Sequence, residues 1–231
     1  MIDESETRLD LALTVHSLLR GVYGTPVWEG KSDPIAALVN TILSQNTNDR
    51  NRDVAFAQLQ RRYATWEAVR DAAPAEVVEA IRPAGLAPSK GPHIQHALSR
   101  ITEERGSLEL DFLADLPLEA ARAWLLSLDG VGPKTAEIVL LFALGRPAFP
   151  VDTHIHRVTR RLGLIPTSTS REAAHTLLEA MLPPDIYYPF HINLIEHGRQ
   201  VCHAGRPQCE RCILRDLCCD YQSRQSARSE P

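Results

Sequence analysis

The sequence predicts an all-α protein, and three observations support this fold class. Turn-forming residues (Gly, Pro, Asn and Ser) recur every ten to twenty positions. Between them, apolar residues recur at three- and four-residue steps, the spacing of one helical face. No segment shows a convincing strand-like alternation, although "VNTILS" is short enough to be read either way. Helices are expected over residues 9–19, 33–43, 53–63, 74–81, 91–104, 117–128, 133–144, 153–162, 170–181 and 190–200.

Length and composition are those of a globular protein. The chain has 231 residues, of which 44% are hydrophobic and 23% charged, enough for one large domain or two small ones. It has no apolar run of about eighteen residues that could span a membrane. The stretch "MIDESETRLD" lacks a signal-peptide pattern, so we expect a cytoplasmic protein. The polar end "SRQSARSEP", residues 223–231, is expected to be disordered.

The net charge of −4 argues mildly against a nucleic-acid partner, but local charge matters more than the sum. Residues 130–171 contain six basic and two acidic side chains. The sequence therefore allows a basic, phosphate-binding surface on a weakly acidic protein.

The segment "LDGVGPKTA", residues 128–136, predicts two helices joined by a tight turn. Gly130 and Gly132 permit positive φ and close backbone approach, and Pro133 suits the first position of a helix. Such a turn aims free backbone N–H groups, including that of Val131, at one point beside the positive end of a helix dipole. This arrangement predicts a phosphate cradle.

Lys134 would lie just inside that helix. Only three of the 25 basic residues are lysines. The helix dipole disfavours an ammonium ion there and favours a free amine, which can form a Schiff base. The alternative is a lysine that contacts a DNA phosphate or is simply solvated.

The segment "FPVDTHIHRVTRRLGLIP", residues 149–166, predicts a helix that starts near Thr153. Asp152 would be its N-cap or, alternatively, a carboxylate that assists bond cleavage. His154 and His156 are two residues apart, which points them to different faces and makes a poor metal pair. We place His154 among the candidate DNA contacts. The arginines 157, 160 and 161 are expected to form a phosphate-facing or solvated face.

All five cysteines lie between residues 202 and 219, a clustering that indicates metal binding rather than disulfides in a cytosolic chain. Four of them have the spacing C-x6-C-x2-C-x5-C: Cys202, Cys209, Cys212 and Cys218. Zinc usually takes two separated C-x2-C pairs, and only one is present. The uneven spacing favours a four-iron cluster. The alternatives for Cys219 are a spare thiol or a register slipped by one residue, and the spacing selects Cys218 as the ligand.

Taken in this order, these elements resemble the endonuclease III family of DNA glycosylases in the helix-hairpin-helix superfamily. The hairpin, "VDTHIHR", the cysteine loop and the upstream "ILSQNTND" all match. The resemblance implies two helical lobes with DNA bound across the cleft between them. A six-helix barrel with the hairpin would span residues 27–146, and a [4Fe–4S] lobe would combine residues 1–26 with 147–231.

The resemblance also implies roles for individual residues. Lys134 matches the nucleophile that attacks the damaged nucleotide, Asp152 the carboxylate that assists base departure, and the four cysteines the cluster ligands. Leu86, in "AGLAPSK", matches a leucine that wedges into the duplex; its alternative is a buried loop anchor. Lys90, in the same segment, is expected to contact a phosphate or to be solvated.

One segment departs from the family pattern. The chain reads "LSQNTND" at residues 43–49 where the family commonly reads "LSAQATD". Asn46 aligns with the glutamine that fills the gap left by the flipped base, and Gln45 lies one residue earlier. Ser44, Gln45 and Asn46 are therefore all candidate DNA contacts, and the choice between Gln45 and Asn46 as gap filler stays open.

The function expected from these features is a bifunctional glycosylase that removes oxidised pyrimidines from double-stranded DNA and cleaves the abasic site. We expect a monomer associated with the nucleoid. One alternative is a glycosylase of the same superfamily for alkylated, mismatched or methylated bases, since "QNT" also resembles those enzymes. An alternative of another class is a silent DNA-binding or redox-sensing protein, which would have no chemical reason to keep both Lys134 and Asp152.

Overall fold

The structure is a computed structural model that describes the backbone of residues 4–229 and the side chains of residues 6–227. Its regular elements are helices, and the described part of the chain contains no strand. The helices are α1 (Glu4–Tyr23), α2 (Pro34–Ser44), α3 (Asp49–Arg62), α4 (Trp66–Asp71), α5 (Pro74–Ala80), α6 (Ala87–Arg105), α7 (Leu118–Leu126), α8 (Pro133–Ile138), α9 (Thr153–Leu162), α10 (Arg171–Met181), α11 (Tyr187–Gln200) and α12 (Cys219–Ser229). This confirms the all-α prediction.

The chain divides into two compact units, which are described separately. Residues 29–146 form the hairpin unit, and residues 1–28 with 147–231 form the cluster unit. The sequence places the boundaries after residues 26 and 146, and the structure divides the chain after residues 28 and 146. Within the described residues, no helix is both long and apolar enough to cross a membrane.

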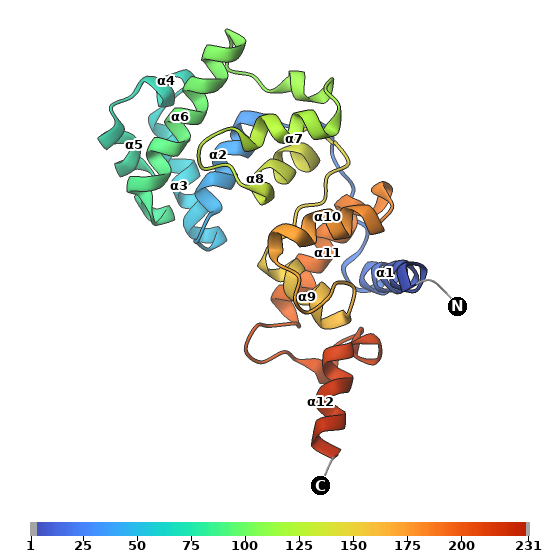
Figure 1. Cartoon of the computed structure of the whole chain (residues 1–231). Helices are drawn as coiled ribbons and strands as arrows, with labels where there is room; N and C mark the ends of the chain where they lie inside the picture. Colours follow the sequence, from blue (N-terminus) through green and yellow to red (C-terminus); the bar gives the residue numbers. More distant parts are fainter. Residues whose placement is uncertain (1–3, 230–231) are drawn as a thin grey trace. The chain divides into compact units, whose positions relative to one another are not determined.

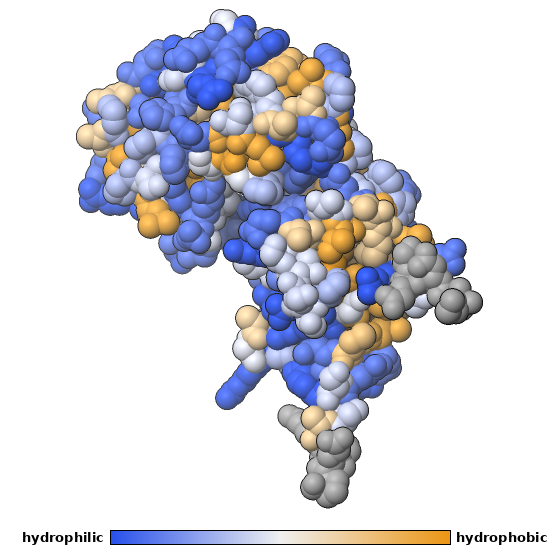
Figure 2. Space-filling view, in the orientation of Figure 1, coloured by the Kyte–Doolittle hydropathy of each residue, from blue (hydrophilic) through white to orange (hydrophobic). Residues whose placement is uncertain are grey.

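In the hairpin unit, α2 is the central element and packs against α3, α6 and α8 (Figure 1). Its large apolar side chains, including Leu38 and Ile42, are buried. The helix begins where Asp33 accepts hydrogen bonds from the backbone N–H groups of Ile35 and Ala36. "VNTILS" therefore belongs to a helix, not a strand. In Figure 2, hydrophilic residues cover most of this unit's visible face.

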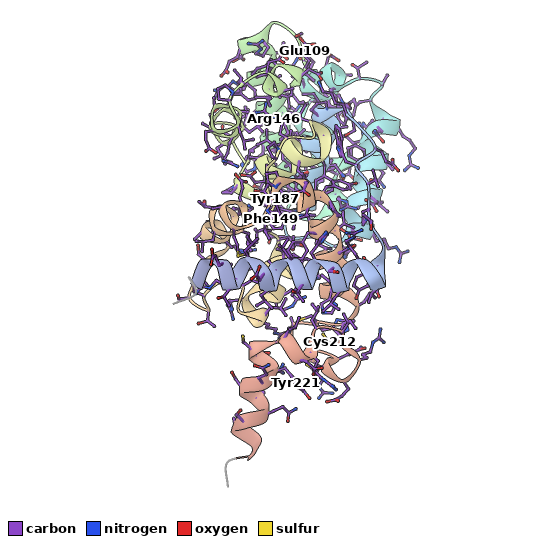
Figure 3. All side chains as sticks on the ribbon, turned by 90° about the vertical axis from the view of Figure 1, so that its right-hand side faces the viewer. Glu109, Arg146, Phe149, Tyr187, Cys212 and Tyr221 are labelled. Carbon is purple, nitrogen blue, oxygen red and sulfur yellow. The ribbon has the colours of Figure 1, made fainter. Side chains whose placement is uncertain are left out.

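In the cluster unit, α11 packs against α1 and α9. An aromatic group fills the core, with Phe149 in edge-to-face contact with Tyr187 (5.4 Å between ring centroids; Figure 3) and close to Phe190. The α1 segment lies far from α11 in sequence, and the amide of Asn193 helps to hold it by donating to the carbonyl of Gly24.

Two α-helices, α4 and α12, lie where the sequence predicts none. The short α4 was not expected, because its six residues are fewer than two helical turns and give little periodicity. The tail predicted to be disordered is helical as far as Ser229. In α12, Arg224 forms an i,i+4 ion pair with Asp220 and bonds its carbonyl. Side chains spaced four residues apart on a helix can support it without a large apolar face.

Candidate active site and metal centre

The predicted hairpin joins α7 to α8. Gly130 has a φ of +77°, and a Cβ at this position would lie 2.7 Å from the ring of His93. The turn therefore requires glycine there. Gly132, by contrast, has a φ of −97°, and nothing lies within 4 Å of a Cβ built on it. Gly132 does not use the positive φ that glycine permits, and its surroundings are open to a close approach.

The helix after the turn buries the apolar face that the sequence predicts. Pro133 occupies its first position. Val131 is 7% exposed, and its backbone N–H donates to the carbonyl of Leu128 at 3.1 Å, so the expectation that this N–H is free is wrong. The helix continues beyond Ile138 as a π-helical segment, Val139–Ala143. The residues of the predicted face are all buried: Ala136, Val139, Leu140, Ala143 and Leu144.

Lys134 lies in the first turn of α8 and is half-buried. Its Nζ atom donates to the Oγ atom of Ser44 at 3.2 Å. Ser44 is the last residue of α2, and its own hydroxyl donates to the carbonyl of Thr41 at 2.7 Å. This second bond uses the hydroxyl proton, so a lone pair of Ser44 faces the amine. Two candidate residues 90 positions apart are thus brought together.

Gln45 and Asn46 have different environments. The side-chain amide of Gln45 donates to the carbonyl of Gly130 at 2.9 Å and thereby ties the end of α2 to the hairpin turn. Asn46 is exposed and has a φ of +49°. Gln45 therefore has a structural partner, whereas Asn46 projects from the surface of the hairpin unit.

Leu86, like Asn46, is exposed and has a left-handed backbone. It is 57% exposed and has a φ of +51°, so it is not the buried anchor that the sequence left as an alternative. Asn46 and Leu86 are the only non-glycine residues of the described chain with positive φ. The left-handed conformation costs roughly 1–2 kcal/mol for a residue with a Cβ, and such strain clusters at functional sites.

The prediction that Lys90 contacts a phosphate or is solvated is wrong. It is 2% exposed, and its Nζ atom donates to the carbonyls of Leu43 and Ala84 at 2.8 and 2.9 Å. Burial lowers the pKa of the Lys90 ammonium group. It is neither solvated nor placed to contact a phosphate, because the carbonyls at two helix ends hold it inside the unit. Sequence periodicity could not identify this role.

In the cluster unit, Asp152 caps α9. Its Oδ1 atom accepts from the backbone N–H of Ile155 at 2.7 Å, so the N-cap interpretation is confirmed. The half-buried carboxylate keeps its second oxygen for another partner. His154 follows, and its Nδ1 atom lies 3.1 Å from the guanidinium of Arg157. An Nδ1 that accepts from arginine leaves the proton on Nε2, which makes Nε2 a donor.

Two of the three arginines on α9 support the cysteine loop and do not form a solvated face. Arg157 donates to the carbonyls of Cys202 and Gly198, at 2.8 and 2.9 Å. Arg161 donates to the carbonyls of His203 and Ala204, at 2.8 and 2.9 Å. The sequence did not predict this role, because the carbonyls that the two arginines bond lie more than forty residues away in the chain.

Four cysteines line one hollow between the loop and the start of α12: Cys202, Cys209, Cys212 and Cys218. Figure 3 shows Cys212 in this loop and Tyr221 in α12. Cys219 does not line the hollow, and its Sγ atom faces the carbonyl of Leu162 at 3.4 Å. No three metal-binding side chains in the described residues converge on one point, as ligands of a single ion would. The thiols instead surround a space.

Hydrogen-bond donors face three of these four sulfur atoms. Arg161 donates to Cys202 at 3.2 Å, Arg224 to Cys209 at 3.6 Å, and Nε2 of His197 lies 3.5 Å from Cys212. Such donors fit a group held by thiolates, whose negative charge they would partly balance.

Burial shifts the pKa values of two of the thiols and of the neighbouring His197. Burial raises the pKa of Cys212 to about 11 and also raises that of Cys218, so iron must displace their protons when it binds. Burial lowers the pKa of His197 to about 4, which keeps its ring neutral. The hydroxyl of Tyr23 lies 3.2 Å from the other ring nitrogen of His197.

Residues 39–184 match the family model of the HhH-GPD superfamily base excision DNA repair protein. The chain belongs to this family. Residues 202–218 match the iron-sulfur binding domain of endonuclease III, the stretch that carries the four aligned cysteines. The protein is therefore an endonuclease III-type base excision repair glycosylase with a [4Fe–4S] cluster.

Individual relatives agree with the family match. Endonuclease III of Thermotoga maritima is 34% identical over 84% of this chain and 86% of its own length. Endonuclease III of Sulfolobus acidocaldarius is 32% identical over 80% of this chain and 82% of its own length. Among solved structures, a non-covalent endonuclease III–DNA complex has a TM-score of 0.78 and 27% identity, and covers 98% of this chain and 100% of that one. This HhH-GPD protein therefore has a DNA-binding fold.

Proposed function

We propose that this HhH-GPD protein is a bifunctional glycosylase that removes oxidised pyrimidines from double-stranded DNA and cleaves the resulting abasic site by β-elimination. The observation that carries the proposal is the amine of Lys134, which lies in the first turn of α8 and bonds Ser44. An enzyme that only hydrolysed the glycosidic bond would need no amine there.

The proposed chemistry uses Lys134 in its neutral form. The base leaves with the electron pair of the glycosidic bond, and Nζ forms a bond to the anomeric carbon of the sugar. Ring opening converts this adduct to a protonated imine. Loss of a proton from the neighbouring carbon then expels the 3′ phosphate and breaks the strand. Ser44 supports the first step because it holds the amine by accepting its hydrogen bond.

Asp152 is proposed to stabilise the positive charge that develops on the sugar as the base departs. The capping bond to Ile155 holds one carboxylate oxygen, which orients the other. A carboxylate fixed before the reaction requires little reorganisation when the charge appears.

Asn46 and Leu86 are proposed to enter the duplex when the damaged base leaves the stack. Flipping costs a few kcal/mol, and side chains that occupy the gap offset part of this cost. Their exposure and left-handed backbones support the role. Gln45 is less suited to fill the gap, because its amide already bonds the carbonyl of Gly130.

The hairpin backbone at Gly130 and Gly132 is proposed to bind a DNA phosphate, supported by the open space around Gly132. The N–H of Val131 is not part of this proposal, because it donates to the carbonyl of Leu128. His154 is proposed as a further phosphate contact through Nε2. We propose that the protein acts as a monomer on nucleoid DNA. The [4Fe–4S] cluster, held by the four cysteines, would supply structural support to the loop; no chemical step of this mechanism uses it.

The proposal is tested with four duplexes that carry an oxidised thymine, an alkylated purine, a methylated cytosine or a bare abasic site. We expect base release and β-elimination products on the oxidised-thymine duplex and cleavage of the abasic duplex. Base release from an alkylated or methylated duplex alone would replace the proposed substrate by the alternative class. No base release from any duplex and no cleavage of the abasic duplex, with DNA binding intact, would make this a silent binding protein.

A further inference from the structure

Lys90 bridges two segments that lie about forty residues apart in the chain. It stands in the first turn of α6, is 2% exposed, and reaches the carbonyls of Leu43 and Ala84 through the same Nζ atom. Leu43 belongs to the end of α2, and Ala84 ends the short helical segment Arg82–Ala84. One buried side chain thus fixes two chain ends relative to each other.

Each of these carbonyls lies just before an exposed residue with a left-handed backbone. Asn46 follows Leu43 by three residues, and Leu86 follows Ala84 by two. Few backbone angles separate the two Lys90 hydrogen bonds from the two residues, so the bonds constrain their spacing. Close packing of α6 adds to this constraint, since a Cβ on Gly91 would lie 2.9 Å from Val78.

A buried ammonium group is a costly way to bridge two carbonyls, because the charge loses its hydration. The cost is consistent with a function that needs the bridge to be rigid. Bases stack about 3.4 Å apart along a strand. Two side chains that enter one lesion must match that spacing, and a misplacement of about 1 Å can lower a rate roughly 100-fold.

We propose that Lys90 is a positioning residue that sets the spacing of Asn46 and Leu86 for entry into the duplex. This role rests on the proposed function. Lys90 does not contact DNA; it acts through the backbone segments that present the two residues.

The test compares Lys90→Met with Gln95→Met. Gln95 lies on the same helix, is 8% exposed, and its amide donates to the carbonyls of Val69, Arg70 and Ala72. Both substitutions remove a buried side chain that bonds helix-end carbonyls. Of these two residues, Lys90 alone bonds the segments that lead to Asn46 and Leu86.

The readout that separates positioning from stability is the fluorescence of 2-aminopurine opposite a non-cleavable abasic analogue, measured with all DNA bound. Stacking quenches this base, and residues that enter the gap unstack it. Thermal unfolding midpoints are measured for the same proteins. The fluorescence and the affinity for undamaged DNA are then measured at a temperature well below the midpoints of both variants.

We expect Lys90→Met to lose most of the fluorescence increase and to slow base excision by about tenfold or more, with affinity for undamaged DNA within about twofold of the wild-type value. Gln95→Met should lower the unfolding midpoint at least as much as Lys90→Met does, and it should keep the fluorescence increase. A normal increase in Lys90→Met, or an equal loss in both variants, would overturn the positioning role.

If Lys90→Met does not fold, Lys90→Arg carries the test, because it keeps the charge and the donors but changes the length of the bridge. We expect Lys90→Arg to fold and to give a reduced fluorescence increase; a wild-type increase would overturn the role. If the wild-type protein itself gives no increase and no excision, the proposed function fails before any substitution is compared.

Discussion

The amine of Lys134 and the hydroxyl of Ser44 are 3.2 Å apart, and the hydroxyl proton of Ser44 is committed to the carbonyl of Thr41. Ser44 therefore accepts a hydrogen bond from the amine and orients it. Ser44→Ala should slow borohydride trapping on an abasic duplex by about five- to tenfold, because one hydrogen bond contributes roughly 1 kcal/mol.

Ser127 provides the matched control for this substitution. Its hydroxyl makes the same kind of bond, to the carbonyl of Trp124 at 2.7 Å, at the end of α7. Ser127→Ala should therefore leave the trapping rate unaltered. Equal rates for Ser44→Ala and the wild-type protein would show that Ser44 does not position the amine.

Gln45 and Asn46 should separate into a structural residue and a DNA contact. Gln45→Ala removes the bond to Gly130 and should lower the free energy of unfolding by about 1 kcal/mol. Asn46→Ala removes an exposed side chain and should leave stability nearly unchanged but slow base excision. Denaturant unfolding and single-turnover excision of both variants check this. The reverse pattern would identify Gln45 as the gap filler.

Leu86 should show a conflict between stability and activity. Leu86→Gly relieves the left-handed strain and should stabilise the protein by up to about 1 kcal/mol. The same change removes the apolar side chain from the loop and should reduce excision. Leu86→Ala keeps the strain and loses the wedge. If Leu86→Gly excised damaged bases at the wild-type rate, the wedge assignment would be wrong.

Arg161 should be needed for the iron–sulfur cluster, whereas its neighbour Arg160 should not. Arg161→Gln removes the hydrogen bonds to His203, Ala204 and Cys202, so the purified protein should contain much less iron and absorb weakly in the visible region. Arg160 is exposed, and Arg160→Gln should retain a full cluster. Iron content and visible absorbance measure both. Full iron content in Arg161→Gln would contradict the supporting role.

The sequence predicted the elements whose signals are local. The hairpin could be found because glycine and proline positions fix a turn, and the cysteine loop because its ligands lie within seventeen residues. Lys90 and Arg161 could not be assigned correctly, because both bond backbone carbonyls that folding brings from distant segments. A lysine that bridges two helix ends looks, in sequence, like any lysine on an amphipathic helix. The same holds for Ser44, whose partner Lys134 is 90 residues away.

The assignment of Lys134 as nucleophile is tested most directly by mapping the adduct that borohydride traps on an abasic duplex. The chain has three lysines, Lys31, Lys90 and Lys134, so few amines compete. After trypsin digestion, we predict the DNA remnant on Lys134, with cleavage between Lys134 and Thr135 blocked. A remnant on Lys31, on Lys90 or on the α-amino group of the chain would contradict the assignment and the Schiff-base mechanism built on it.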